Sequence, residues 1–164
     1  AGEGLDYAIR FGDGAWHGTH AERIMDAPMS VMCAPSLAHG LRTAADLARQ
    51  PLLRSYRTDE WAAWFEAAGA PCPVVRGAVF DSSLTLAEAA AQGAGMALLP
   101  VTMFTRELQQ GRLVQPFALE LHRGAYWLTH LQSRTVTEAM AAFSAWLRAQ
   151  HTGSTAENTN ENGL

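Results

Sequence analysis

Residues 74–100 read VVRGAVFDSSLTLAEAAAQGAGMALLP, and this stretch decides the fold class. Val74–Phe80 is rich in β-branched residues and predicts a strand. The acidic and hydroxyl residues at 81–83 are good N-caps and predict a helix over Leu84–Gln92, which a glycine ends. Gly95–Leu99 is a short apolar run that predicts a second, buried strand. A strand, a helix and another strand in succession indicate an α/β fold with mostly parallel pairing.

The same alternation extends on both sides of this stretch. Further strands are predicted over Leu5–Phe11, Met29–Cys33, Leu52–Arg54, Arg112–Phe117 and Tyr126–Leu131. Further helices are predicted over Thr43–Gln50, Trp61–Ala68 and Pro100–Gly111, and after Thr135. Asp46 and Glu138 stand three residues after Thr43 and Thr135, which predicts a capping box at both helix starts. Residues 151–164 are rich in Asn, Thr and Gly and predict a disordered tail.

The predicted strand Leu5–Phe11 raises a question about its partners. It is apolar enough to be an interior strand that is buried on both faces. Only four residues precede it in this chain. Either later strands flank it or a piece of the domain is missing. We favour the missing piece, because a buried strand without partners leaves backbone groups unpaired.

Composition and charge exclude several classes of function. The 164 residues carry a formal net charge of -4, and all 12 basic residues are arginine. A basic surface for phosphate contacts is not evident, so this piece is not expected to bind nucleic acid. The absence of lysine excludes a Schiff base. No run approaches the roughly 18 apolar residues of a membrane span. We expect no cofactor and no membrane partner.

The two cysteines, Cys33 and Cys72, have the spacing of neither a metal pair nor a redox motif. Two unpaired thiols are the preferred interpretation, and they suit a reducing cytoplasm. His17 and His20 stand three residues apart and could form half of a metal site, but no cysteine or carboxylate at a suitable spacing completes it. A solvated loop is the better interpretation, and we expect no bound metal. His39, His122 and His130 are isolated in the sequence.

Two serines at the start of a predicted helix are the best candidates for chemistry. Ser82 and Ser83 can simply cap the helix. They can also bind a carboxylate or another polar group, because a helix that begins at the C-terminal end of a strand presents free backbone N–H groups there. A nucleophilic serine is not expected, since a Gly-x-Ser-x-Gly elbow is absent and Ser-x-x-Lys is impossible without lysine.

Two further residues are candidates for a binding pocket. Tyr126 carries a polar phenol on an apolar ring and so suits a pocket of mixed character, whereas the adjacent Trp127 is more simply a packing residue. Arg10 is either a buried charge that faces the missing piece of the domain or a residue that binds an anion through its guanidinium. The sequence does not separate these two interpretations.

Taken in order, these segments resemble the effector-binding domain of LysR-type transcription regulators. The matching pieces extend over roughly residues 1–150 and are Gly4–Gly12, Met32–Pro35, Ala45–Leu47, Gly93–Pro100, Gly111–Val114 and the last helix. Within that family the chain is most similar to the AmpR-type β-lactamase regulators, through Leu52–Arg57, Asp59–Trp61, Phe80–Ser83 and Tyr126–Thr129. Glycine-cleavage-type regulators share the same outline and are the alternative.

The resemblance implies an α/β fold of two Rossmann-like lobes, like that of periplasmic binding proteins, with an effector in the cleft between them. Lobe one would contain residues 1–30 and 126–150, and lobe two would contain residues 31–125. The family's first strand–helix–strand of lobe one, its linker helix and its DNA-binding helix-turn-helix have no counterpart in this sequence.

The resemblance implies a sensor and not an enzyme. The effectors of AmpR-type regulators are cell-wall fragments: a UDP-linked muramyl pentapeptide favours repression, and anhydro-muramyl peptides favour activation. Carried onto this chain, the matching pocket residues are Ser83 and Tyr126, with Ser82 adjacent, and Arg10 is an additional candidate. The implied partners are a muropeptide-like effector, further copies of the chain, and DNA through the helix-turn-helix alone. A periplasmic-type binding protein and an α/β hydrolase are the rival interpretations.

Overall fold

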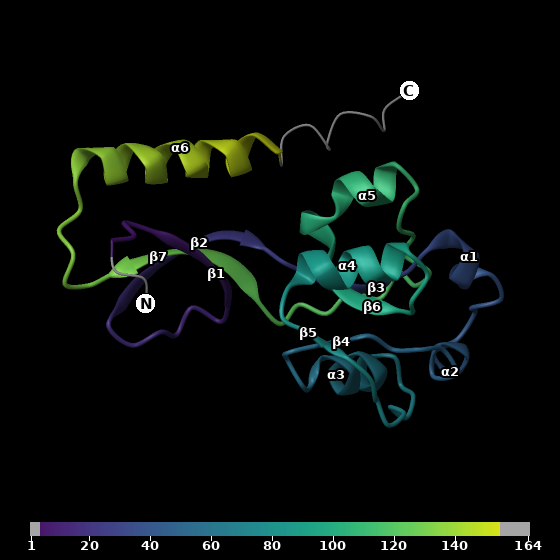
Figure 1. Cartoon of the computed structure of the whole chain (residues 1–164). Helices are drawn as coiled ribbons and strands as arrows, with labels where there is room; N and C mark the ends of the chain where they lie inside the picture. The colour runs from purple at the N-terminus through teal and green to yellow at the C-terminus, as the bar shows by residue number, and fades with distance from the viewer. Residues whose placement is uncertain (1–3, 155–164) are drawn as a thin grey trace. The chain divides into compact units, whose positions relative to one another are not determined.

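The computed structural model describes residues 4–154 of the chain (Figure 1). The chain divides into two compact units, and each is described by itself. Unit 1 combines the chain up to Asp26 with the chain from Arg123, and unit 2 is the continuous segment Ala27–His122. The division falls at residues 26 and 122, a few residues before the boundaries at 30 and 125 that the sequence predicts. None of the described helices has the length and apolar character that crossing a bilayer requires.

Unit 1 contains a three-stranded antiparallel sheet in the order β1-β7-β2. The strands are β1 (Ala8–Gly12), β2 (Thr19–Asp26) and β7 (Ala125–Leu131). The central strand β7 pairs with β1 along one edge and with β2 along the other. A bulge between Arg23 and Met25 shifts the register of β2, so that Met25 lies opposite Tyr126. The strands predicted around Leu5–Phe11 and Tyr126–Leu131 are confirmed, with shifts at their ends.

The strand β2 was not predicted, and the interpretation of His20 as part of a solvated loop is wrong. His17 lies in the turn before β2, whereas His20 lies within the strand opposite His130. The sequence THAERIMD mixes charged and apolar residues and lacks the apolar run by which the other strands were recognised. Pairing with β7 overrides this weak local signal, as tertiary context commonly does for strands.

The strand β1 lies at the edge of the sheet and is not buried on both faces. Ile9 is 57% exposed, and a later strand, β7, flanks β1 on one side. Among the described residues, no strand pairs with the other edge of β1. Of the two alternatives, the one in which later strands flank β1 on both sides does not hold within the described residues. The free edge of β1 agrees with the favoured alternative, in which its other partner belongs to a missing piece of the domain.

The helix α6 (Glu138–Ser154) packs on one face of this sheet through Met140 and Ser144, both of which are buried (Figure 1). The N–H of Met140 donates to the hydroxyl of Thr137, at 3.3 Å. Thr137, and not Thr135, therefore supplies the hydroxyl at the helix start, so the predicted capping box at Thr135 is wrong. Residues 151–154 of the predicted tail are helical, and residues 155–164 lie outside the described residues.

Unit 2 contains two short ladders. β3 (Met29–Met32) pairs antiparallel with β6 (Ala97–Pro100), and β4 (Arg54–Ser55) pairs parallel with β5 (Val79–Phe80). A parallel bridge between Leu52 and Met96 gives β4 and β6 the same direction. The prediction of mostly parallel pairing is therefore wrong. The strands that helices connect, β4, β5 and β6, run in the same direction. β3 pairs antiparallel with β6, and all strands of the unit 1 sheet pair antiparallel.

The helices of unit 2 are α1 (Pro35–Ala38), α2 (Ala44–Leu47), α3 (Glu60–Ala67), α4 (Ser83–Ala91) and α5 (Thr105–Gln109), with a 3-10 turn at Val101–Met103. The predicted capping box at α2 is confirmed, since the side chains of Thr43 and Asp46 each accept from the other residue's N–H. Hydrogen bonds from the Thr43 hydroxyl and from the backbone of Arg42 and Thr43 lower the pKa of Asp46 to about 2.

The strand predicted over Arg112–Phe117 is absent apart from a single antiparallel bridge between Val114 and Cys33. Pro116 lies in this segment and has no N–H to donate to a ladder. Strand-like composition is therefore not sufficient here, and apart from this bridge the segment is an irregular part of unit 2.

The core of unit 2 holds α4 against β6. It contains buried residues of α4, of both strands of the β3–β6 ladder and of the segment after β6, namely Met32, Leu86, Ala87, Ala90, Ala97, Leu99, Phe104 and Leu113. Because these side chains fix the helix axis, the residues at the N-terminus of α4 have a defined position at the end of β5.

The close approach of Gly95 to Pro51 gives a first prediction. A Cβ atom at position 95 would lie 2.4 Å from the carbonyl oxygen of Pro51, which accepts the N–H of Met96 at 2.8 Å. Gly95→Ala must displace this backbone and should lower the free energy of unfolding by about 2 kcal/mol. Urea unfolding measures the effect, with Ala94→Ser at the exposed neighbouring position as the control. Equal midpoints for both variants would contradict the predicted clash.

Candidate functional site

The N-terminus of α4 lies at an edge of unit 2 where strands end. β4 and β5 run parallel, and the bridge from Leu52 to Met96 aligns β6 with them, so the C-terminal ends of all three strands meet at one edge. α4 begins directly after β5 at this edge. Ligands in open α/β sheets bind outside the carboxyl ends of the strands, which makes this edge a candidate binding site.

Ser82 is the N-cap of α4, as the sequence predicts. Its Oγ accepts the N–H of Leu84 at 3.2 Å, and its carbonyl accepts the hydroxyl of Thr85 at 2.9 Å. Ser83 is the first residue of the helix and is half-buried, and within residues 4–154 its hydroxyl forms no hydrogen bond. The capping role of Ser82 is therefore confirmed, while the hydroxyl of Ser83 is available to a ligand.

The same edge of unit 2 is where the chain enters this unit. Met29, at the start of β3, lies opposite Pro100, at the end of β6, and the N–H of Val101 donates to the carbonyl of Pro28 at 2.8 Å. The chain leaves nearby, because Met29 and Leu121 exchange two backbone hydrogen bonds of 3.0 and 2.8 Å. The entry and the exit of unit 2 are thus joined at the edge where the three strands end.

Tyr126 lies in unit 1, a few residues after the chain leaves unit 2. It is half-buried in β7, opposite Phe11 of β1 and Met25 of β2. Its ring meets the ring of Phe11 edge to face, with 5.7 Å between the centroids. Cross-strand aromatic pairs of this kind fix the ring orientation, so the phenol of Tyr126 projects from a rigid strand.

Arg10 and Tyr126 project from opposite faces of the unit 1 sheet. Arg10 lies opposite Trp127, and side chains alternate along a strand, so Arg10 shares a face with Trp127 and not with Tyr126. Its guanidinium stacks over the ring of Trp16 at 4.4 Å from the centroid. Arg10 is exposed in this chain, and both interpretations, a charge that faces a missing piece of the domain and an anion-binding residue, stay predictions. Trp127 packs in unit 1 as predicted, and its indole N–H donates to the carbonyl of Gly12.

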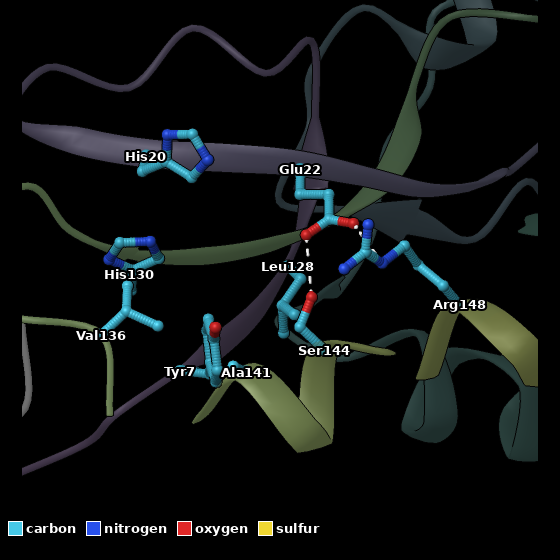
Figure 2. Close-up of a pocket in the computed structure, with 9 residues that line it drawn as sticks. All are labelled: Tyr7, His20, Glu22, Leu128, His130, Val136, Ala141, Ser144 and Arg148. Atoms are coloured by element: carbon cyan, nitrogen blue, oxygen red, sulfur yellow. Dashed lines mark hydrogen bonds and ion pairs between the residues drawn. The ribbon is translucent and has the colours of Figure 1, made fainter. Parts of the chain in front are cut away.

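A cavity of about 210 Å³ lies between the sheet of unit 1 and α6 (Figure 2). Glu22 of β2 stands between two residues of α6 in this cavity: it accepts the Ser144 hydroxyl at 2.9 Å and pairs with Arg148 at 3.0 Å. This network is not evident from the sequence. No local signal could have revealed it, because 122 positions separate Glu22 from Ser144.

Two other cavities lie within single units. One of about 320 Å³ in unit 1 is lined by Arg10 together with Asp6, Thr19 and Thr129. One of about 210 Å³ in unit 2 is lined by Arg54, Arg57 and Cys72. These cavities bring together none of Ser82, Ser83 and Tyr126. The position of each predicted effector residue is therefore described only relative to the unit to which that residue belongs.

The residues of the site do not form a catalytic centre. Neither Ser82 nor Ser83 is hydrogen-bonded to a histidine in the described part of the chain, so a general base for a serine nucleophile is not in place there. The described residues also contain no group of three or more His, Cys, Asp or Glu side chains arranged to hold a metal ion.

Comparison with known proteins defines the class. The family model of the LysR substrate binding domain matches residues 1–152, so the chain belongs to this family. The chain is 56% identical over 149 residues to the HTH-type transcriptional activator AmpR of Pseudomonas aeruginosa, and the match covers 90% of this chain and 50% of that protein. It therefore spans about half the length of this relative.

Two solved structures share the fold. The effector domain of the transcriptional regulator AmpR of Pseudomonas aeruginosa is 53% identical with a TM-score of 0.87, covering 93% of this chain and 74% of that chain. The Citrobacter freundii effector binding domain with three substitutions (threonine to valine, serine to alanine and tyrosine to phenylalanine) is 50% identical with a TM-score of 0.86, covering 90% and 76%. The predicted two-lobe α/β fold is confirmed, and the similar proteins are regulators rather than enzymes.

The two thiols of unit 2 differ in their surroundings. Cys33 is buried, and desolvation raises its pKa to about 11. Cys72 is exposed, although partial desolvation raises its pKa as well. Both thiols are free, as the sequence predicts. A thiol reacts as the thiolate, so Cys33 is inert in the folded chain both because reagents cannot reach it and because it stays protonated at neutral pH.

This difference gives a second prediction. At pH 8 an aromatic disulfide reagent should modify one thiol per folded chain, Cys72, and two thiols per chain after unfolding in urea. Absorbance of the released thiolate counts the modified groups. A Cys72→Ser variant should show almost no fast reaction. Two fast-reacting thiols in the folded chain would contradict the burial of Cys33.

Proposed function

We propose that this chain is the effector-sensing domain of a cytoplasmic transcription regulator that controls a β-lactamase gene in response to muropeptide cell-wall fragments. One observation carries the proposal. Ser83 and Tyr126 are separated in sequence by the same number of residues as the serine and the tyrosine that were replaced in the Citrobacter freundii effector binding domain. This equal spacing, in a relative that is 50% identical, supports the choice of Ser83 and Tyr126 as effector contacts.

The chemistry of the two positions suits a peptide linked to a sugar. The start of α4 offers the free hydroxyl of Ser83 and backbone N–H groups at the positive end of a helix, which favour a carboxylate of a peptide. The phenol of Tyr126 offers one polar group on an apolar ring, which favours a sugar or a peptide amide. Ser82 contributes mainly as the residue that sets the start of α4.

Arg10 remains a predicted effector contact, and it is tested separately from Ser83 and Tyr126. Because it projects from the sheet face opposite Tyr126, a small group bound by Tyr126 would not reach it within unit 1. The substitution Arg10→Gln therefore tests this residue independently of the other positions. A loss of effector affinity in that variant would mean that the ligand contacts both faces of the sheet.

The intact protein would respond by a shift in population. The proposal includes DNA binding through a helix-turn-helix outside the matched half of the relatives, and assembly into homo-oligomers that space these modules. A repressing and an activating muropeptide would favour different arrangements of the domain. Complete reversal of a 99:1 preference requires a differential affinity of about 5.5 kcal/mol, and a smaller response requires less.

The proposal predicts a separation of effector binding from operator binding. In the full-length regulator, Ser83→Ala and Tyr126→Phe should each weaken binding of UDP-linked muramyl pentapeptide about fivefold, because each removes one hydrogen bond that contributes about 1 kcal/mol. Titration calorimetry measures the affinity, a gel-shift assay measures operator binding, and a β-lactamase reporter measures induction.

Two matched variants serve as controls. Ser36→Ala changes a serine of α1 that is exposed, and Tyr7→Phe changes a tyrosine beneath α6, so both should leave affinity and induction unchanged. If Ser83→Ala or Tyr126→Phe abolished operator binding, or left muropeptide affinity unchanged, the assignment of these residues would be refuted. Binding of a different small molecule with the same dependence on Ser83 and Tyr126 would support the glycine-cleavage-type alternative.

A further inference from the structure

His20 and His130 form a pair of imidazoles across two neighbouring strands. They are register partners in β2 and β7, and their ring centroids are 5.1 Å apart with the planes tilted by 42°. Both rings line the cavity beneath α6, where Figure 2 shows them on adjacent strands. Cross-strand partners have Cβ atoms only about 5 Å apart, so the two side chains are neighbours by construction of the sheet.

Each imidazole has a nitrogen that is available to a ligand. Nδ1 of His130 lies 3.0 Å from the carbonyl oxygen of Leu131. A carbonyl can only accept, so in the neutral ring the proton resides on Nδ1 and Nε2 carries the lone pair. Metal-binding histidines typically have this backbone partner on the other ring nitrogen. Within the described residues, His20 forms no hydrogen bond or ion pair.

Among the described side chains around the pair, only the two imidazoles offer a nitrogen ligand to a metal ion. Tyr7 meets His130 edge to face at 5.5 Å, and Val136 lines the same cavity. The carboxylate that lines the same cavity, Glu22, is already bound to Ser144 and Arg148 of α6. The remaining ligand positions of an ion held here would therefore be filled by water.

We propose that His20 and His130 together bind a divalent transition-metal ion: Zn²⁺, Ni²⁺ or Cu²⁺. An ion about 2.1 Å from each of two nitrogens at a tetrahedral angle needs those nitrogens roughly 3.4 Å apart. A centroid separation of 5.1 Å is compatible with this spacing when one nitrogen of each ring is turned toward the ion. Imidazole selects these ions, whereas Mg²⁺ and Ca²⁺ require the carboxylate and carbonyl oxygens that the pair lacks.

The proposed site departs from the expectation that no metal is bound, and it adds a second imidazole to the half-site considered for His20. His17 is the nearest histidine to His20 in the sequence, but it lies in the turn before β2. The second imidazole comes instead from His130, a residue that is isolated in the sequence. An ion bound by this pair would join β2 to β7 and so stabilise the unit 1 sheet by linkage between binding and folding.

Calorimetric titration of the untagged full chain at pH 7.5 with ZnCl2 and with NiCl2 tests the proposal. One ion per chain is expected, and His20→Gln and His130→Gln should each weaken binding by more than about tenfold, since even loss of a residue that only orients a metal ligand costs that much. His17→Gln and His39→Gln are matched controls and should bind as the unchanged chain does.

A second measurement separates loss of the site from loss of the fold. Thermal unfolding without metal should give the same midpoint for His20→Gln and His130→Gln as for the unchanged chain. ZnCl2 should raise the midpoint of the unchanged chain and of the two controls, but not of these two variants. Paramagnetic Ni²⁺ should broaden the NMR signals of two imidazoles. Undiminished affinity in both variants, or a loss of affinity in His17→Gln instead, would overturn the assignment.

Discussion

The hydrogen bonds that β7 exchanges with β1 along one edge and with β2 along the other hold unit 1 together. β7 follows unit 2 in the chain, whereas β1 and β2 precede it, so both ladders close a very long loop. Alternation along β7 directs Tyr126 and His130 to the side of α6, and Trp127 and Thr129 to the other side. One strand thus carries a proposed effector contact, a proposed metal ligand and the packing that orients both.

The elements that sequence predicts well have their determinants close together. The serine that begins α4 and the Thr43–Asp46 capping box are contacts over two or three residues, and the structure reproduces both. The predictions that were wrong concern elements whose formation depends on partners far away in the sequence. β2 lacks a strong strand signal and exists because β7 pairs with it, whereas Arg112–Phe117 has strand-like composition but no ladder.

The candidate sites divide in the same way. Ser82 and Ser83 could be found from sequence, because a hydroxyl before a helix is a local pattern. Tyr126 could be selected only as a residue of suitable chemistry, and the sheet face that separates it from Arg10 requires the register of β1 against β7. Two contacts join residues more than a hundred positions apart: His20 pairs with His130, and Ser144 donates a hydrogen bond to Glu22. Local sequence patterns therefore cannot predict either contact.

The two backbone hydrogen bonds between Met29 and Leu121 have an architectural consequence. They bring the beginning and the end of unit 2 side by side, so this unit is a cassette, that is, a continuous segment inserted in the sequence between the two segments of unit 1. Insertions with adjacent ends are easily exchanged during evolution, because the host needs to bridge only a short gap. A related regulator could therefore acquire a new ligand preference by swapping this cassette, while the host sheet with its central strand keeps its own fold.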